Sequence, residues 1–345
     1  MTQQEITQLQ LELADQHSTT TLKTTHVSWV ILCSDVVYKI PKAVSLPYLD
    51  FSTLAQRRLY CENEVRLNRR LTDGVYLGVE TIWKKAEQYG IGAIPAGATI
   101  VDYAIKMKRL PQDRLMYLML QKGKVEAHHI LALAQQMASF HQKAALVATA
   151  PSIATLQTDF ADLRSSIAVV AQVLHQAAAK EIEEWVLASN HFLQAHEGRM
   201  LERHQLGYYR ELHGDLHSEN IFLLEEPVVF DCIAFNEHFR QGDVLNELAF
   251  FCMDMDYHRQ APLGHQFLQH YLSNFPGMET EEDQQLFLYY KLYRANVRLK
   301  VNALKWEQST EPAEQKRRAE VVREYFYLMR YYAKAVFNPL TLAST

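Results

Sequence analysis

Residues 213–231 read HGDLHSENIFLLEEPVVFD, which joins a polar loop to two short apolar runs. The apolar runs cover residues 221–224 and 228–230, and a Glu-Glu-Pro turn separates them, so the pattern predicts a β-hairpin. Asn220 comes one residue before the first run, and Asp231 one residue after the second. We therefore expect both side chains at the open end of the hairpin, equally far from its turn.

An amide oxygen and a carboxylate are ligands that suit a hard divalent cation. Mg²⁺ typically takes only one or two such protein ligands and keeps phosphate and water oxygens as the rest. Asn220 and Asp231 are therefore predicted magnesium ligands. Asp215 lies on the loop that enters the hairpin, where it would accept or orient a hydroxyl proton during attack on phosphorus. We predict Asp215 as the catalytic residue.

The β signal upstream of this stretch is confined to the N-terminal part of the chain. Runs of β-branched and aromatic residues predict strands at residues 20–25, 28–33, 36–40, 78–83 and 101–108. Residues 54–71 predict one helix among them, because their apolar side chains recur on one face. Residues 1–20 would form a short amphipathic helix or a loosely held terminus.

The composition changes at Leu110-Pro111, and the rest of the chain has mainly helical character. Residues 126–205 are rich in Ala, Leu, Gln and Glu, which predicts helices that include residues 130–141 and 180–200. We expect two domains, residues 1–110 and 111–345. The fold class predicted from this layout is α+β, with a small antiparallel β lobe that carries one helix and a larger, mainly helical lobe.

The order of HxDxxxxN, hairpin and Asp resembles the catalytic loop and metal-binding aspartate of the kinase-like superfamily. His-Gly-Asp-Leu-His at residues 213–217 resembles the branch of aminoglycoside phosphotransferases and choline kinases. The stretches SWVILCSDVVYKIPK, LDFSTLAQRRLYCENEVRLNRRL and FDCIAFNEHFR are similar to bacterial aminoglycoside phosphotransferase-like proteins of largely unassigned substrate. Some of those proteins are fused to a phosphate-loop domain. No GxxxxGKS or GxxxxGKT occurs here, so we expect the phosphotransferase-like part alone.

The resemblance implies a protein-kinase-like two-lobe fold and an ATP- and Mg²⁺-dependent phosphotransferase. Its acceptor would be a hydroxyl group of a small molecule. No segment of the sequence identifies that molecule, and the choice between ATP and GTP and the oligomeric state also stay open.

Lys39, in the stretch VVYKI, resembles the kinase lysine that holds the α- and β-phosphates. Glu64 is its predicted partner, because a carboxylate within an apolar helical stripe needs a buried cation. Glu62 projects about 160° away from that stripe and is the weaker alternative. Lys42, which follows Pro41, is the weaker alternative to Lys39.

Where a glycine-rich loop would cover the phosphates, the chain has Thr-Thr-His-Val-Ser at residues 24–28, without glycine. Hydroxyl and backbone N–H groups can still reach a phosphate. Ser28, and Met107 and Lys108 at the end of the last predicted N-terminal strand, are the further candidates for nucleotide contact.

Two rival interpretations remain. His213, Asp215 and His217 form an HxDxH pattern that would supply metal ligands to a hydrolase. Alternatively, a decayed phosphate loop would leave a pseudokinase that binds nucleotide without catalysing phosphoryl transfer.

Acidic residues after the hairpin, among them Glu237, Asp254 and Asp256, suggest a pocket for a polar, cationic acceptor.

Overall composition argues against several partners. The formal charge is −5, the pI is near 6.3, and no long basic run occurs, so we expect neither nucleic acid nor membrane binding. No bilayer-spanning apolar run or signal-peptide pattern is present, and we expect a cytoplasmic protein. The four cysteines are scattered singly, which favours reduced core residues over a disulfide framework.

Overall fold

The computed structural model describes residues 1–15, 17, 19–46 and 49–337. The chain forms two compact units. The first contains residues 1–124, 213–215 and 219–240, and the second contains the rest. The chain therefore returns to the first unit for parts of the polar loop and for the hairpin. The predicted domains, residues 1–110 and 111–345, stay a proposal.

The first unit is built on a six-stranded sheet of order β1-β2-β3-β8-β6-β7, with antiparallel pairing throughout. Its strands are β1 (Thr21–Thr24), β2 (Ser28–Leu32), β3 (Val36–Pro41), β6 (Tyr76–Lys85), β7 (Gln88–Ile91) and β8 (Thr99–Lys108). The five predicted strands are present, and the prediction omitted β7. A separate small hairpin joins β4 (Ser45–Leu46) and β5 (Leu49–Asp50).

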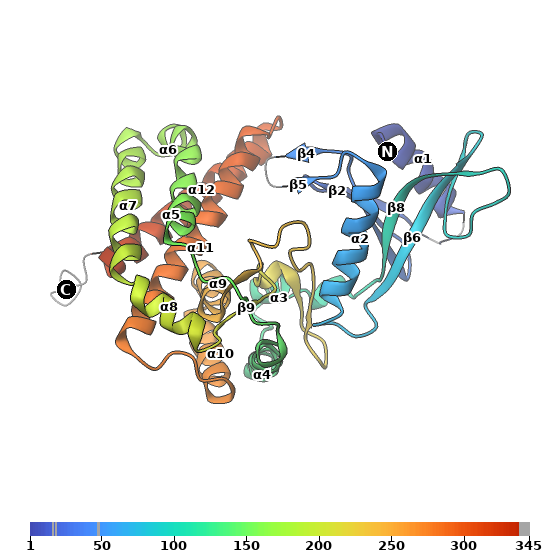
Figure 1. The fold of residues 1–345 in the computed structure, drawn as a ribbon. Helices are drawn as coiled ribbons and strands as arrows, with labels where there is room; N and C mark the ends of the chain where they lie inside the picture. The colour runs from blue at the N-terminus through green and yellow to red at the C-terminus, as the bar shows by residue number, and fades with distance from the viewer. Residues whose placement is uncertain (16, 18, 47–48, 338–345) are drawn as a thin grey trace. The chain divides into compact units, whose positions relative to one another are not determined.

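Each face of this sheet is covered by a helix (Figure 1). α1 (Gln3–Ala14) begins with a capping box at Thr2 and buries Ile6, Leu9 and Leu13 against one face. α2 (Leu54–Asn68) begins with a capping box at Thr53 and contacts β8 and β6 on the other face. The terminal segment is therefore a helix, the first of the two options that the sequence left open, and α2 ends three residues before the predicted end.

The hairpin of β10 (Ile221–Phe222) and β11 (Val228–Val229) is present, although its strands are shorter than predicted. The polar loop before it ends in a 3₁₀ turn, η3 (Ser218–Asn220). η1 (Gln112–Arg114) and α3 (Met116–Gln121) complete the first unit. Leu115 forms a β-bridge to Phe222, which ties the end of the N-terminal segment to the hairpin.

The second unit is mainly helical, and its long helices α11 and α12 lie side by side (Figure 1). Its helices are α4 (Ala127–Lys143), α5 (Ile153–Ala161), α6 (Ile167–Val173), α7 (Gln176–Ala195), α8 (Glu197–Gln205), α9 (Val244–Tyr257), α10 (Ala261–Asn274), α11 (Glu281–Glu307) and α12 (Pro312–Phe337). η2 (Asp162–Ser166) joins α5 to α6, and β9 (Tyr209–Glu211) pairs with β12 (Gln241–Asp243). The helix predicted at residues 180–200 is two helices, because the chain breaks at His196.

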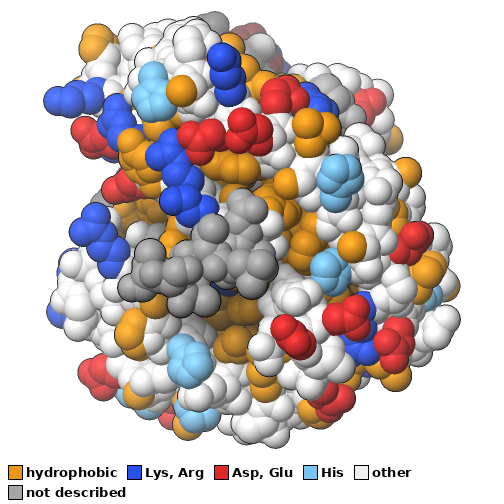
Figure 2. All heavy atoms as spheres, turned by 90° about the vertical axis from the view of Figure 1, so that its left-hand side faces the viewer, with side chains coloured by type: hydrophobic (Ala, Val, Ile, Leu, Met, Phe, Trp, Pro, Cys, Tyr) orange, Lys and Arg blue, Asp and Glu red, His pale blue; other side chains and the backbone are white. Residues whose placement is uncertain are grey.

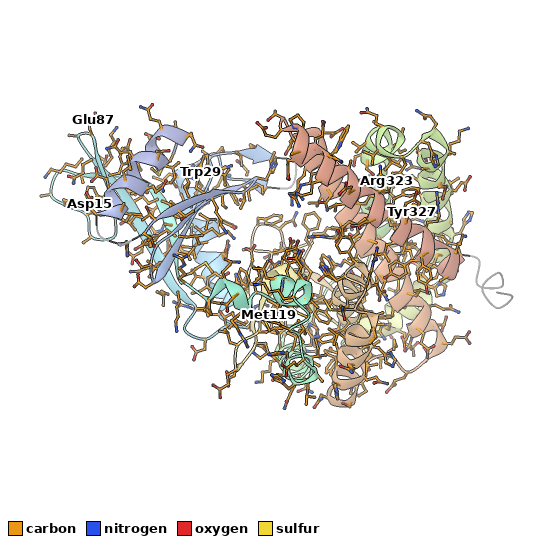
Figure 3. All side chains as sticks on the ribbon, turned by 180° about the vertical axis from the view of Figure 1, so that it is seen from behind. Asp15, Trp29, Glu87, Met119, Arg323 and Tyr327 are labelled. Carbon is orange, nitrogen blue, oxygen red and sulfur yellow. The ribbon has the colours of Figure 1, made fainter. Side chains whose placement is uncertain are left out.

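Side chains fill the interior of both units (Figure 3). All four cysteines are buried free thiols, as predicted. On the face drawn in Figure 2, acidic and basic side chains are interspersed with hydrophobic ones. Within the described residues, no helix combines the length and the apolar character that crossing a bilayer requires.

Candidate active site

A triad of charged side chains, Lys39, Glu64 and Asp231, lies within the first unit. The Nζ atom of Lys39 on β3 is 2.7 Å from Oε1 of Glu64 on α2 and 2.6 Å from Oδ1 of Asp231 after the hairpin. The predicted ion pair between Lys39 and Glu64 is therefore present. Glu62 instead pairs with Arg58 on the exposed side of α2.

The two carboxylates of the triad differ in burial. The Glu64 side chain is 1% exposed and the Asp231 side chain 45% exposed. Burial raises the pKa of Glu64, and the Lys39 ammonium only partly opposes that effect. Burial also disfavours the charge of Lys39, but Asp231 and Glu64 outweigh it and raise the pKa of Lys39 well above its ordinary value. Lys39 is thus a fixed cation with one partner that solvent can reach.

The backbone around Asp231 is held by side chains that the sequence analysis missed. Asp231 has a left-handed backbone with φ of 62°, and its N–H donates to the Tyr76 hydroxyl at 3.1 Å. The N–H of Cys232 donates to Oδ1 of Asn68 at 2.9 Å. Asn68 follows Glu64 by four residues on the same helical face, which is a signal that could have identified it. Nothing in the sequence singles out Tyr76.

The hairpin register differs from the predicted one by one residue. Ile221 pairs with Val229, so Asn220 lies opposite Phe230, whose N–H donates to its carbonyl at 3.1 Å. Asp231 follows one residue beyond this pair. The predicted equal distance from the turn was therefore wrong, although both residues do lie at the open end.

Asp215 is fixed by Asn220. The Nδ2 group of Asn220 donates to the backbone carbonyl and to Oδ2 of Asp215, both at 3.0 Å. This commits the amide nitrogen to Asp215 and turns the amide oxygen of Asn220 away from it. The N–H of Asp215 also donates to Nδ1 of His213 at 3.2 Å, and Gly214 between them has φ of +87°. A Cβ atom at Gly214 would lie 2.7 Å from the Phe239 carbonyl oxygen, so this sharp turn requires glycine.

Both ring nitrogens of His213 are engaged with the protein. Besides Nδ1, Nε2 lies 2.9 Å from the carbonyl oxygen of Phe230 and joins the loop to the hairpin. His213 therefore acts as a structural residue, and the HxDxH hydrolase loses its first metal ligand. Among the residues that the structure describes, no group of three or more His, Cys, Asp and Glu is arranged to hold a metal ion.

Three of the predicted nucleotide residues share one face of the sheet. Val30 pairs with Lys39 and Val37 with Met107, so Ser28, Lys39 and Met107 all project toward the face that α2 covers. Ser28 is fully buried, and its Oγ has no hydrogen-bond partner in the described part of the chain. Lys108 is exposed on the opposite face, and its N–H donates to the Val75 carbonyl. The structure does not bring the Lys108 side chain together with the others.

The carboxylates suggested for a cationic acceptor already have partners. Glu237 pairs with Arg240, Asp256 pairs with Lys291, and buried Asp254 accepts from the N–H of Ser218. A cationic acceptor stays a prediction, because these contacts do not test the charge of the acceptor.

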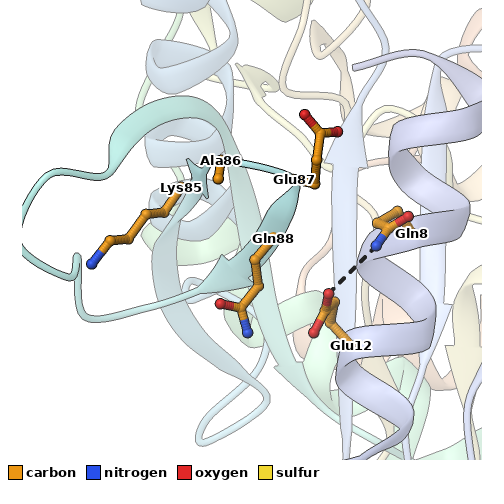
Figure 4. A pocket seen from close by; sticks show the side chains of 6 residues that line it. All are labelled: Gln8, Glu12, Lys85, Ala86, Glu87 and Gln88. Carbon is orange, nitrogen blue, oxygen red and sulfur yellow. Dashed lines mark hydrogen bonds between the residues drawn. The ribbon is translucent and has the colours of Figure 1, made fainter.

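A surface hollow lies away from the triad, between α1 and the turn that joins β6 to β7 (Figure 4). Gln8 and Glu12, which contact each other at 3.5 Å, line one side, and residues 85–88 line the other. None of the predicted site residues lines this hollow.

Comparison with known proteins gives a family match and several relatives. The sequence pattern described as "Phosphotransferase enzyme family" matches residues 80–282. The uncharacterized protein Rv2004c of Mycobacterium tuberculosis and its Mycobacterium bovis counterpart Mb2027c are each 27% identical over 308 residues, which is 85% of this chain and 56% of theirs. The chain thus spans about half the length of these curated relatives.

Solved structures share the fold at low sequence identity. Choline kinase from Cryptosporidium parvum has a TM-score of 0.56 at 10% identity, covering 94% of this chain and 92% of its own. The GDP and kanamycin complex of an aminoglycoside phosphotransferase has a TM-score of 0.52 at 12% identity, covering 94% and 98%. These similarities confirm the predicted protein-kinase-like fold, with a small antiparallel β lobe and a larger, mainly helical one.

Proposed function

Because the chain belongs to the phosphotransferase enzyme family, we propose that it transfers the terminal phosphoryl group of ATP, with Mg²⁺, to a hydroxyl group of a small molecule. The observation that carries this proposal is the triad, in which one strand lysine contacts both a buried helix carboxylate and a half-exposed carboxylate after the hairpin. That arrangement combines a fixed cation for phosphate oxygens with a reachable hard oxygen ligand.

The residues of the first unit fit the two groups that the reaction needs. Lys39 and the unpartnered Ser28 hydroxyl are donors suited to phosphate oxygens. The Asp231 carboxylate and the Asn220 amide oxygen are donors suited to Mg²⁺. When bound, the metal would neutralise charge on the phosphates. Met107, on the same sheet face as Lys39, would contact the nucleotide base.

Asp215 would accept or orient the proton of the attacking hydroxyl group. Its carboxylate accepts a hydrogen bond from Asn220, which is a predicted metal ligand. The Asn220 side chain would therefore orient the catalytic base and also bind the metal. A general base contributes typically about 10²–10⁴-fold in rate. The remaining acceleration would come from position and charge around the phosphates.

The acceptor class is supported by the chain after Asp231. Only residues 232–242 separate Asp231 from Asp243, which caps α9 by accepting from the N–H of Leu245. Protein kinases need a longer regulatory segment with a phosphorylatable residue here, whereas residues 232–271 contain no Ser or Thr. One structural neighbour was solved with GDP and kanamycin, which supports a nucleotide donor and a small hydroxylated acceptor for this chain.

The test is an ATP-consumption screen against aminoglycosides, amino alcohols, sugars and nucleosides, with Mg²⁺ and with EDTA. We expect Mg²⁺-dependent turnover with at least one class, and its loss in Asp215→Asn. Labelling of proteins in a cell extract without small-molecule turnover would contradict the proposal. ATP binding without turnover on any acceptor would favour the pseudokinase.

A further inference from the structure

The turn that connects β1 to β2 is held by hydrogen bonds between its two ends and contains no glycine. Thr25 and Ser28 are joined by three hydrogen bonds: Thr25 N–H to the Ser28 carbonyl at 2.9 Å, Thr25 hydroxyl to the same carbonyl at 3.1 Å, and Ser28 N–H to the Thr25 hydroxyl at 2.9 Å. No residue of this turn is among the described residues with positive φ. The turn therefore needs no glycine, and its shape depends on side chains.

Lys42 contacts this turn with both its backbone and its side chain. Its N–H donates to the Val27 carbonyl at 2.8 Å, and its ammonium donates to the Thr25 carbonyl at 2.5 Å. The ammonium also lies 4.2 Å from the centroid of the Trp29 ring (labelled in Figure 3), a cation–π contact.

Lys42 and Lys39 approach the sheet from opposite faces. Trp29 pairs with Ile40, and both belong to the core under α1, whereas Lys39 projects toward α2. The Lys42 ammonium lies over Trp29, so it sits on the α1 side. Lys42 is therefore placed to hold the turn rather than to share a phosphate with Lys39.

Hydrogen bonds in and around this turn occupy three of its carbonyl oxygens and leave two of its N–H groups available to a ligand. The carbonyls of Thr25, Val27 and Ser28 are committed to protein donors. Within the described residues, the backbone N–H groups of His26 and Val27 have no acceptor. Carbonyl oxygens repel a phosphate, whereas successive N–H groups attract it. Ser28 Oγ, on the Lys39 face, adds a third donor.

We propose that Lys42 is a positioning residue that fixes a glycine-free phosphate-binding turn, so that the N–H groups of His26 and Val27 and the Ser28 hydroxyl receive the phosphates of the nucleotide. This inference rests on the proposed nucleotide site. Its consequence is that affinity for phosphates depends on a lysine that does not touch them.

The test compares the affinities of purified variants for ATP, ADP and adenosine by titration calorimetry. Loss of a hydrogen bond to a charged donor is typically worth about tenfold, so Lys42→Met should weaken ATP and ADP alike by about that factor and leave adenosine unchanged. Lys42→Arg should restore binding, because a guanidinium can also donate to the Thr25 carbonyl and stack on Trp29. Lys23→Met, an exposed lysine on β1, is the matched control and should bind as the wild type does.

Thr25→Val provides a second variant that keeps Lys42. It removes the hydroxyl that joins Thr25 to Ser28, and it should give the same loss for ATP and ADP without loss for adenosine. Wild-type affinity in both variants would overturn this inference alone. A loss confined to ATP in Lys42→Met would also overturn it, because it would indicate direct contact with the terminal phosphate. Failure of the wild-type protein to bind ATP would instead overturn the proposed function and this inference with it.

Discussion

The carboxylate of Asp231 lies 2.6 Å from the ammonium of Lys39, although the two residues are 192 positions apart in the chain. Glu64 occupies the other side of the same ammonium. A single cation therefore compensates one carboxylate that water cannot reach and one that it can. The two pairs should respond differently to substitution, because an unpaired charge costs more when it is buried.

Removal of the Lys39 cation should lower the free energy of unfolding more than removal of either carboxylate, Glu64 or Asp231. Lys39→Met leaves Glu64 as a buried, uncompensated carboxylate, and we expect the free energy of unfolding to fall by about 3 kcal/mol, with loss of ATP binding. Glu64→Gln keeps the contact between Lys39 and Asp231 and should have a smaller effect. Urea unfolding of the single and double variants would measure the coupling between the two residues.

The control for this cycle is a half-exposed pair on the same sheet, Lys106 and Glu80, whose charged atoms are 3.6 Å apart. Lys106→Met should change stability by less than about 1 kcal/mol. Strict additivity of Lys39→Met and Glu64→Gln would contradict the triad.

Asp231→Asn should raise the Mg²⁺ concentration needed for half-maximal turnover. The substitution keeps the size of the side chain but removes the negative charge that a hard cation prefers. Turnover measured against Mg²⁺ concentration would give the shift directly. Asp73→Asn, an exposed aspartate of the same unit, should leave the curve unchanged. An unaltered curve in Asp231→Asn would remove Asp231 from the metal site.

Asp215→Asn should lower turnover by at least about 10²-fold and leave the dissociation constant for ATP nearly unchanged, because it alters proton acceptance rather than phosphate binding. Asn220→Ala removes both hydrogen bonds that orient Asp215 and one predicted metal ligand. We therefore expect it to affect turnover and Mg²⁺ dependence together. Single-turnover rates and ATP titrations of both variants separate these effects. Normal turnover in Asp215→Asn would place the catalytic base elsewhere.

The pairing of Lys39 with Glu64 was predictable because helical periodicity places Glu64 in an apolar stripe, where only a paired carboxylate is stable. The contacts of Asp231 with Lys39 and Tyr76 were not, since they arise from packing between segments far apart in the chain. Local pattern also left the hairpin register uncertain by one residue, because each of its strands pairs through only two residues.

The omission of β7 has a related cause. Its sequence, QYGI, contains Gly90, which suggests a break in a strand. In the structure a Cβ atom at Gly90 would lie 2.2 Å from the Trp83 ring, so glycine is required by the ring that packs on it. A glycine that admits a neighbouring side chain and one that ends a strand look alike in sequence.

The stability of the second unit should fall in acid because of Asp283. This carboxylate is fully buried at the start of α11, and it accepts hydrogen bonds from both Arg199 and Arg203 and from the N–H groups of Glu279 and Thr280. Burial alone would raise the pKa of Asp283, but the bonds from Arg199, the two N–H groups and the charge of Arg203 outweigh it and lower that pKa. The folded state therefore holds the carboxylate ionised at pH values where the unfolded chain binds a proton.

The sign of the effect follows from this difference. The stabilisation is fully present above the unfolded pKa of about 3.9 and is lost as the pH falls toward the lower folded value. Asp283→Asn should reduce the free energy of unfolding by about 3 kcal/mol at pH 7, because it leaves buried Arg203 with one carboxylate partner fewer. The gap between wild type and variant should narrow below about pH 4. Urea unfolding between pH 7 and pH 3 measures this gap.

Glu314→Gln is the matched control, since Glu314 also contacts two arginines but is 39% exposed. The substitution should lower the free energy of unfolding by less than about 1 kcal/mol. A constant gap between wild type and Asp283→Asn across this range would show that the carboxylate stabilises the unit by its shape and hydrogen bonds rather than by its charge.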